Sequence, residues 1–534
     1  MRRCNLILSA VMLLTAQLFT AVTPVSARTR LSDKALYSRH VDFLASEPVG
    51  GRKPGTPGAR KARAYIVSHL RQLGLKPAFQ GDYCQQFPIT IGIKAETQQL
   101  RAVGADKKLT NLQAARDFNA LALSASRSFS GQAVFVGYAI TNKARKYDNF
   151  ADVTKNSLKG RVAVAMRYEP HDNTGQSRWT SQPLGWTRSA SLAAKSARAS
   201  WSGASALLIV NPPAHSKAPL LTTRARAYGA RALPVLHVTT DAFKRMLTGA
   251  SLDADKEFSR LHTLAQTNAK GVCEIPGLSV SGKVILKSLR GKTYNIAVKL
   301  PGRGVLAGEA IIVGAHWDHV GRLAKTAKSD DKQGYFPGAD DNASGAAGIL
   351  ILAKRLAARA RRNPSEHRRS IVLACFGAEE LGLLGSAYMA RNLRQLGLKD
   401  SQVIAMVNMD MIGRLRDNKL YAWGVEGKSW KRIVRSSAKD SGLTLTVSGP
   451  GLGLSDHGSF HRRKIPVVCM NTGLHDDVHR TSDTSDKIDA AGAIRILNVV
   501  DRLLESLATQ AEPIQSEPAD PKSGKPERQP AKQN

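Results

Sequence analysis

The chain has 534 residues, enough for two or three domains, and its 42% hydrophobic content with 44 glycines is typical of a globular protein with a sizeable core. Its 78 Lys and Arg residues against 42 Asp and Glu give a formal net charge of +36. No nucleic-acid-binding motif accompanies this charge, so we expect a basic surface without a specific nucleic-acid partner.

Residues 1–27 have the composition of a signal peptide. Arg2 and Arg3 form a basic start, an apolar run from Leu6 to Val22 follows, and Val25-Ser26-Ala27 is a small-x-small cleavage site. We therefore expect export to the periplasm or the extracellular space, with no membrane contact beyond export. An uncleaved membrane anchor is the alternative.

Residues 28–130 are expected to form the first part of the main domain. Ser32 can cap a helix that runs to about Ser46. A turn-rich loop over 51–58 separates this helix from a second one, over 59–73, and a strand-like run over 86–91 follows.

Between about residues 131 and 265 the pattern changes to short β-like runs with a single intervening helix. No cluster of histidines and carboxylates appears here. We expect a small mixed β/α domain inserted into the main domain, which either shapes access or binds substrate, or is a structural appendage. The runs lie at 133–136, 162–166, 206–210 and 234–238, and the helix at about 191–202.

Residues 266–510 are expected to complete the main domain. Short apolar runs that end in small or polar residues are typical of buried parallel strands. The predicted fold class is therefore α/β, with a mixed, largely parallel sheet flanked by helices. Residues 511–534 hold five prolines and few apolar residues, which predicts a disordered tail. The apolar runs are 310–315, 370–376, 403–409 and 466–470, and an amphipathic helix over 488–507 follows them.

Five acidic or imidazole side chains follow the ends of these apolar runs or open the next helix. The carboxyl ends of parallel strands meet in one crevice, where unpaired carboxylates repel one another and a divalent cation relieves the repulsion. Nitrogen and oxygen donors without thiolate suit zinc, with manganese or cobalt as possible substitutes. A shared carboxylate allows two ions. The five are His316, Asp341, Glu380, Asp410 and His479.

The five cysteines contain no CxxC pair, which argues against a cysteine zinc site. Cys375 and Cys469 lie in apolar runs and are predicted to be buried thiols. Cys84 and Cys273 lie in the outer parts of the chain and could pair.

The sequence around the candidate ligands resembles the M28 co-catalytic zinc peptidases, which include bacterial leucyl-type aminopeptidases and glutamate carboxypeptidase-like proteins. The loop over 51–58 and Ser455-Asp456-His457 are also similar to parts of that family, and residues 131–265 resemble a protease-associated (PA) domain. The matching motifs are His316-x-Asp318, Gly338-Ala339-x-Asp341-Asn342-Ala343-Ser344-Gly345, Glu379-Glu380, Asn408-x-Asp410 and His479-Arg480-Thr481-Ser482-Asp483-Thr484.

The resemblance implies a role for each of these residues. Asp341 would bridge two Zn²⁺ ions, with His316 and Asp410 completing one site. Glu380 and His479 would complete the other. Two further residues would act in catalysis: Glu379 as the general base for a metal-bridged water, and Asp318 as the hydrogen-bond partner of the His316 imidazole.

Neighbouring residues compete for some of these roles. Asp340 is adjacent to Asp341, but the position of Asp341 matches the family motif. His475 lies near His479, and the Arg-Thr-Ser-Asp-Thr run after His479 favours His479. The spare histidines are His319, His461 and His457, the last of which either touches the substrate or lies on the surface.

The function implied by the resemblance is that of a secreted dizinc exopeptidase with peptide substrates, in particular an aminopeptidase. The alternatives are a glutamate carboxypeptidase-like enzyme and a non-catalytic, PA-bearing binding protein of the same fold. A carboxypeptidase needs Arg or Lys to hold the substrate carboxylate, and basic residues are too frequent here to decide this. A binding protein has no need for Glu379 beside a complete ligand set.

Overall fold

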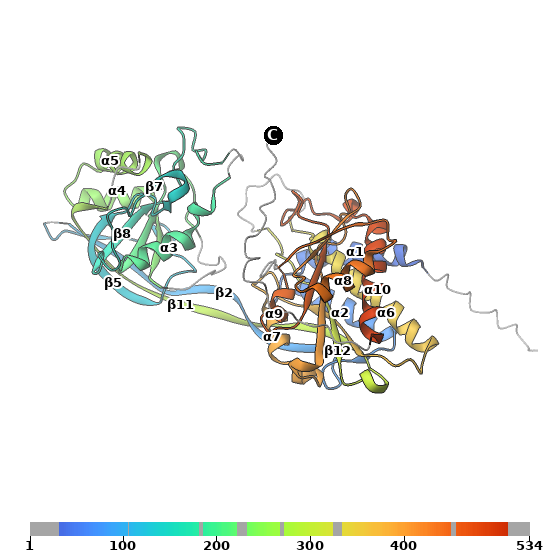
Figure 1. Cartoon of the computed structure of the whole chain (residues 1–534). Helices are drawn as coiled ribbons and strands as arrows, with labels where there is room; N and C mark the ends of the chain where they lie inside the picture. Colours follow the sequence, from blue (N-terminus) through green and yellow to red (C-terminus); the bar gives the residue numbers. More distant parts are fainter. Residues whose placement is uncertain are drawn as a thin grey trace, which may run out of the picture.

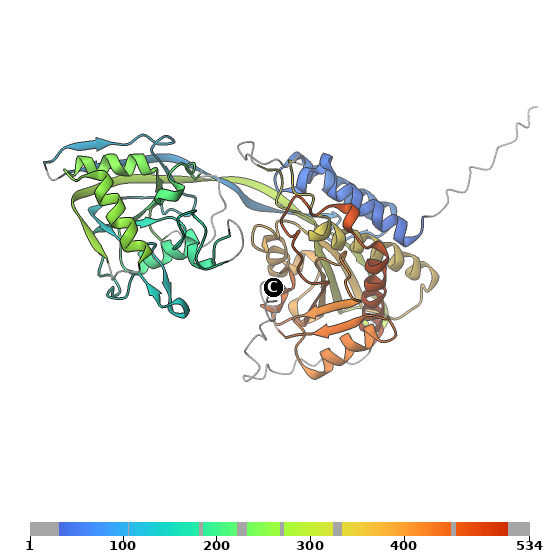
Figure 2. The same ribbon diagram turned by 90° about the horizontal axis from the view of Figure 1, so that it is seen from above.

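The computed structural model describes residues 31–104, 106–180, 185–221, 232–267, 272–323, 334–449 and 455–510. Two lobes are linked by a long antiparallel pair of strands, β2 (Cys84–Val103) and β11 (Cys273–Leu300), which runs from one lobe into the other (Figure 1). A second view shows the same separation of the lobes (Figure 2). The predicted signal peptide and the predicted tail lie outside the described residues.

The first lobe is built on the mixed, largely parallel sheet that the sequence predicted. Strands β12, β13, β14 and β17 run parallel, with β12 between β13 and β14. Strand β11 pairs antiparallel with β13 at one side, and β15 pairs antiparallel with β17 at the other. The strands are β12 (Ala310–His316), β13 (Ser370–Phe376), β14 (Val403–Met409), β15 (Lys419–Trp423), β16 (Thr444–Val447) and β17 (Val467–Asn471), with the short β1 (Lys76–Pro77) beside β11.

Helices cover both faces of this sheet, because its strands are apolar on both sides. Along β12, Ile311 and Val313 face one core, and Ile312 faces the other, as alternating side chains must. The first core receives α1, α2, α6, α8 and α10, and the second receives α7 and α9. Their bounds are α1 (Asp33–Ala45), α2 (Pro57–Gln72), α6 (Gly345–Arg362), α7 (Leu384–Arg391), α8 (Lys428–Ala438), α9 (His457–His461) and α10 (Ala490–Thr509).

The predicted helices of the first lobe form close to their expected bounds. The Ser32 hydroxyl accepts the N–H of Ala35 at the start of α1, as its capping role required. Thr56 caps α2 in the same way. Among the described residues, no helix has both the length and the hydropathy needed to cross a bilayer.

The second lobe is a mixed β/α unit. Its strands extend the sheet in the order β11-β5-β8-β9-β10-β4, with α4 and α5 packed on one face and α3 on the other. Its elements are β3 (Leu109–Asn111), β4 (Phe118–Ala120), β5 (Arg127–Phe135), β6 (Thr141–Asn142), β7 (Tyr147–Asp148), β8 (Arg161–Met166), α3 (Leu192–Trp201), β9 (Ala206–Val210), β10 (Val235–Val238), α4 (Thr240–Gly249) and α5 (Ala254–Gln266).

This lobe extends beyond the predicted boundaries of 131 and 265. Leu100 and Phe118, before the first boundary, and Val280, after the second, lie in its core. The reason is that β2 and β11 are single continuous strands that serve both lobes, so no change of local pattern marks the border. The PA-like nature of the lobe stays a prediction.

The pairing considered for Cys84 and Cys273 is wrong. Both are free, and they lie toward opposite ends of β11: Cys84 is opposite Ile296, whereas Cys273 begins the strand opposite Phe135. The distance between Cys84 and Cys273 could not be predicted from the sequence, because β2 and β11 are long strands that continue through both lobes. Two other cysteines, Cys375 and Cys469, are buried free thiols, as predicted.

Candidate metal centre

The carboxyl edge of the parallel strands gathers the candidate ligands. His316 is the last residue of β12, Glu380 follows β13, and Asp410 follows β14. Asp341 comes from the helical turn Ala339–Ser344 that leads into α6, and His479 from the loop after β17. The three strands are adjacent and parallel, so their ends deliver side chains to one place.

These five side chains form two donor groups that share Asp341. In the first group, His316 Nε2 lies 3.3 Å from Asp341 Oδ1 and 3.4 Å from Asp410 Oδ1. In the second, His479 Nε2 lies 3.0 Å from Asp341 Oδ2 and 3.2 Å from Glu380 Oε1. Asp341 therefore offers one carboxylate oxygen to each group.

A histidine that sequence reasoning left without a role joins the second group. The Nδ1 atom of His319 lies 2.7 Å from Glu380 Oε1 and 3.9 Å from Asp341 Oδ2. The donor atoms of His319, Asp341, Glu380 and His479 all lie within 4.8 Å of one another. The sequence feature that could have identified His319 is its position three residues after His316.

The chemistry and spacing of both groups fit a divalent ion. Two donors on one tetrahedral zinc are about 3.3–3.6 Å apart, since each bond is about 2.0–2.2 Å long. The separations of 3.0–3.4 Å around Asp341 are close to this value. The set contains only imidazole nitrogens and carboxylate oxygens, the donors that zinc, manganese and cobalt accept.

The electrostatics of the pocket call for positive charge. Burial by itself would lower the pKa of His316, but the carboxylates of Glu379, Asp410 and Asp341 raise it well above its ordinary value. Contacts with Asp341 and Glu380 likewise raise the pKa of His479 to about 10. A bound cation would neutralise the same carboxylates and leave the imidazoles neutral, so that they can act as ligands.

Glu379 lies beside this cluster and is half-buried. Burial raises the pKa of its carboxyl group, and the nearby carboxylates of Asp456 and Asp410 raise it further. Asp456 is itself fully buried, and burial raises its pKa to about 7. A raised pKa makes the carboxylate of Glu379 more basic, which is the property a general base requires.

The contacts of Asp318 differ from the expected ones. His316 Nδ1 lies 3.2 Å from the main-chain oxygen of Asp318, whereas the carboxylate is 4.0 Å away. That carboxylate instead accepts the main-chain N–H of Glu379 at 3.0 Å. The turn after β12 accounts for this difference. It places the main-chain carbonyl of Asp318 next to the His316 ring and leaves the Asp318 side chain facing the residues that follow β13.

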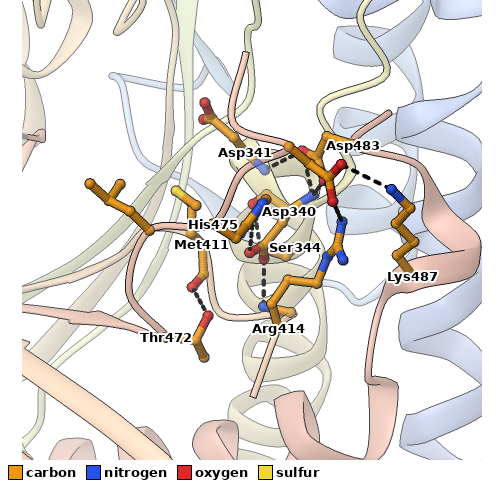
Figure 3. A network of polar contacts seen from close by, with 12 residues as sticks. Asp340, Asp341, Ser344, Met411, Arg414, Thr472, His475, Asp483 and Lys487 are labelled. Carbon is orange, nitrogen blue, oxygen red and sulfur yellow. Dashed lines mark hydrogen bonds and ion pairs between the residues drawn. The ribbon is translucent and has the colours of Figure 1, made fainter. Parts of the chain in front are cut away.

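The two rivals, Asp340 and His475, contact each other rather than the donor groups (Figure 3). Asp340 Oδ1 accepts the N–H of Gly413 at 2.7 Å, and its Oδ2 lies 3.1 Å from His475 Nε2. The Asp483 carboxylate accepts the N–H groups of Asp340 and Asp341, at 3.0 and 3.1 Å. Adjacent side chains thus point to opposite sides, and only Asp341 reaches the donor groups.

Two other spare histidines lie in or beside α9. His457 is fully buried at the first position of the helix, so the alternative of a surface residue is wrong. His461, at its last position, lies 3.4 Å from Glu426. Neither belongs to the two donor groups.

A buried arginine holds the loops of the centre together. The guanidinium of Arg52 donates to the main-chain oxygens of Trp317 at 2.9 Å, Pro337 at 2.7 Å and Gly338 at 2.9 Å, and also to Leu44. Trp317 lies between His316 and Asp318, and Gly338 begins the turn that carries Asp341. Burial lowers the pKa of Arg52 to about 10, which leaves it charged at neutral pH.

Replacing Arg52 by Lys should therefore weaken metal binding as well as stability. A lysine cannot reach all these carbonyls, so buried acceptors lose their donors, at a cost of about 1–3 kcal/mol in unfolding free energy. We expect a 10- to 100-fold loss of zinc affinity, measured by competition with a chromophoric chelator.

The matched control is Arg369→Lys. Arg369 is also buried and donates to the main-chain oxygens of Leu507 and Gln510 and to the carboxylate of Glu309, before β13 and at the opposite end of that strand from the donor groups. This variant should lose stability in urea but keep its zinc affinity. Equal zinc affinities in the two variants would show that Arg52 has no special relation to the centre.

An α/β domain whose strand ends gather carboxylates and imidazoles into two adjoining donor groups is typical of two-metal hydrolases. Residues 295–504 match the model of Peptidase family M28. Aminopeptidase YwaD of Bacillus subtilis is 33% identical over 190 residues, which are 34% of this chain and 36% of YwaD. Leucine aminopeptidase 1 of Arthroderma otae is 31% identical over 208 residues, covering 37% of this chain and 52% of the relative.

Among solved structures, the aminopeptidase from Aneurinibacillus sp. strain AM-1 aligns with a TM-score of 0.53 at 20% identity and covers 91% of this chain and 96% of its own. BSAP, a zinc aminopeptidase from Bacillus subtilis, gives 0.51 at 19% identity, over 89% and 95%. These likenesses show the shared fold. The aligned part spans only about one third to three fifths of the curated relatives' length, 36% of the first and 61% of the second.

Proposed function

We propose that this protein is an exported dizinc aminopeptidase that removes N-terminal residues from peptides. The observation that carries the proposal is the position of Asp341, whose two carboxylate oxygens face two separate donor groups. The match to Peptidase family M28 and the likeness to proteins named aminopeptidases support the reaction class.

In this proposal, His316 and Asp410 would hold one Zn²⁺ ion, Glu380 and His479 would hold the other, and Asp341 would contribute to both sites. The ions supply Lewis-acid chemistry, which polarises a peptide carbonyl and makes water nucleophilic at neutral pH. Mn²⁺ or Co²⁺ can replace zinc, because the donor set has no thiolate.

Glu379 is the general base in this proposal. It borders the cluster without belonging to either donor group, and its main-chain N–H is held by the Asp318 carboxylate. Burial raises the pKa of its carboxyl group. The side chain can therefore take a proton from the attacking water and later give it to the departing amine. The Asp318 carboxylate therefore holds the main chain of Glu379, from which the catalytic side chain extends.

Glu379→Gln should retain zinc but lose turnover. The amide has the same shape as the carboxyl group but cannot accept the proton, so we expect kcat to fall by about 10²–10⁴-fold. Zinc content, measured by mass spectrometry, should stay near that of the wild type. Glu366→Gln is the control: Glu366 is also half-buried but lies before β13, at the opposite end of the strand that leads to Glu379. Near-normal turnover in the Glu379 variant would contradict the assignment of Glu379 as the general base.

A hydrolysis panel separates the candidate activities. We expect aminoacyl-p-nitroanilides with a free amino group to be cleaved, N-blocked dipeptides to be spared, and a chelator to abolish cleavage until zinc is restored. Cleavage of the blocked dipeptides alone would indicate a carboxypeptidase, and cleavage of neither would indicate a binding protein.

Export is the further part of the proposal, supported by the composition of residues 1–27. The mature protein should begin near Arg28, which N-terminal sequencing of protein recovered outside the cytoplasm will test. A chain that keeps Met1 and stays in the cytoplasmic fraction would contradict this expectation.

A further inference from the structure

One edge of strand β11 has no partner strand where β11 passes from one lobe to the other (Figure 1). In the first lobe β13 pairs with this edge from Ile296 onward, and in the second lobe β5 pairs with it as far as Val284. The opposite edge is occupied by β2 over the whole interval. Within the described residues, no strand pairs with the first edge between 285 and 295. An unpaired edge presents main-chain N–H and C=O groups that another extended chain can bind.

Two hydrogen bonds show which residues of β11 direct their main-chain groups toward this free edge. The N–H of Leu286 donates to Ser126 Oγ at 2.9 Å, and the carbonyl oxygen of Tyr294 accepts the indole N–H of Trp317 at 3.1 Å. Along a strand, the N–H and C=O groups of every second residue point to the same edge. Three residues between Leu286 and Tyr294 therefore offer both groups to the free edge. They are Ser288, Arg290 and Lys292.

The free edge begins beside the segment that contains the proposed general base. Strand β13 ends at Phe376, and the N–H of the next residue, Gly377, donates to Asn295 Oδ1 at 3.1 Å. A Cβ atom at Gly377 would lie 2.5 Å from the carbonyl oxygen of Tyr294, so the two main chains are in close contact here. Glu379 follows two residues later. A chain that lay along the free edge would thus continue the line of β13, from the metal centre toward the second lobe.

The side chains along this part of β11 favour an acidic partner. Residues 285–294 include three basic side chains and no acidic one, and all three are exposed: Lys287, Arg290 and Lys292. Basic residues on a strand edge discourage pairing between two copies of the same chain, because like charges would meet. The same residues attract a strand that contains Asp or Glu, since opposite charges on facing residues stabilise a strand pair.

We propose that the free edge of β11 binds the peptide substrate as an added strand, so that the preferred substrates are extended peptides with acidic residues after the cleaved bond. This inference rests on the aminopeptidase function proposed above. The first substrate residue lies at the metal centre, and the residues after it run toward the second lobe, antiparallel to β11, as β13 does. Because paired strands advance by nearly the same distance per residue, the edge over 287–294 accommodates about eight substrate residues.

The first test measures how cleavage by the full-length zinc-loaded enzyme depends on substrate length. The substrates share one N-terminal residue and range from a dipeptide to about twelve residues, in acidic and neutral versions. We expect kcat/KM to rise up to a length of about ten residues, by at least about tenfold over the dipeptide, which corresponds to one or two net hydrogen bonds. Acidic peptides should gain more than neutral ones.

The second test removes the N–H donors of a long acidic peptide one at a time by N-methylation. Main-chain groups that face β11 come from every second residue of the added strand. Methylation at these positions should lower kcat/KM, whereas methylation at the intervening positions should leave it unchanged. Charge attraction without strand pairing would give no such period of two. This test needs no change in the enzyme.

Ser288→Pro is the matching change in the enzyme, because proline removes an N–H from the free edge and leaves the ladder with β2 intact. We expect kcat/KM for the long peptide to fall by about two- to tenfold, the effect of one hydrogen bond, with aminoacyl-p-nitroanilide cleavage unchanged. Thr90→Pro is the control. Thr90 lies on β2 opposite Arg290, so its N–H faces the outer edge of β2, where Pro88 already stands opposite Lys292. It should alter neither activity, and circular dichroism will show that both variants are folded.

A kcat/KM that does not change with length, or a methylation scan without a period of two, would overturn the inference. If the enzyme still cleaves aminoacyl-p-nitroanilides in that case, only the inference fails. If it cleaves neither kind of substrate, the proposed function fails and the inference fails with it. A dimer in sedimentation that Ser288→Pro abolishes would assign the edge to a second copy of the chain, which also overturns the inference.

Discussion

The repulsion among converging carboxylates is the constraint that the rest of the first lobe must satisfy. Asp341, Glu379, Glu380 and Asp410 come from three segments and meet in a pocket where burial raises the pKa of Glu379. Without compensation such a group would take up protons or move apart. Arg52 supplies positive charge near it, and in the proposed enzyme divalent cations take the place of protons on the histidines of the donor groups.

The main chain around the pocket is built to resist this repulsion. The guanidinium of Arg52 donates only to main-chain oxygens, those of Trp317, Pro337 and Gly338 in the two loops that flank the pocket and that of Leu44 in α1. Asp483 acts from the other side by accepting two consecutive N–H groups, those of Asp340 and Asp341. The position of Asp341 is therefore set by main-chain contacts, and its side chain is left available to two donor groups.

The two lobes share their longest strands. Because β2 and β11 continue from one lobe into the other, the second lobe is joined by hydrogen-bonded ladders rather than by a loose linker. A paired ribbon resists stretching more than a single chain does. The β2–β11 ladder thus limits how far the second lobe can move away from the lobe that contains the metal centre.

Local pattern in the sequence determined much of this protein. Apolar runs such as 310–315 and 370–376 predicted the parallel strands, because a strand buried on both faces needs apolar residues throughout. The positions of acidic and imidazole residues after the apolar runs predicted which side chains would meet at the strand ends, and the resemblance to the M28 peptidases favoured Asp341 and His479 over their neighbours Asp340 and His475.

Only the tertiary structure decided the rest. The sequence pattern does not reveal the border of the second lobe, since β2 and β11 cross it without interruption. The separation of Cys84 from Cys273 follows from the same strand pairing. The contact of His319 with the second group, and that of the Asp318 carboxylate with Glu379, depend on how loops after different strands pack together. Local residue preferences determine elements, whereas side-chain directions at a shared edge are determined by contacts between segments distant in the chain.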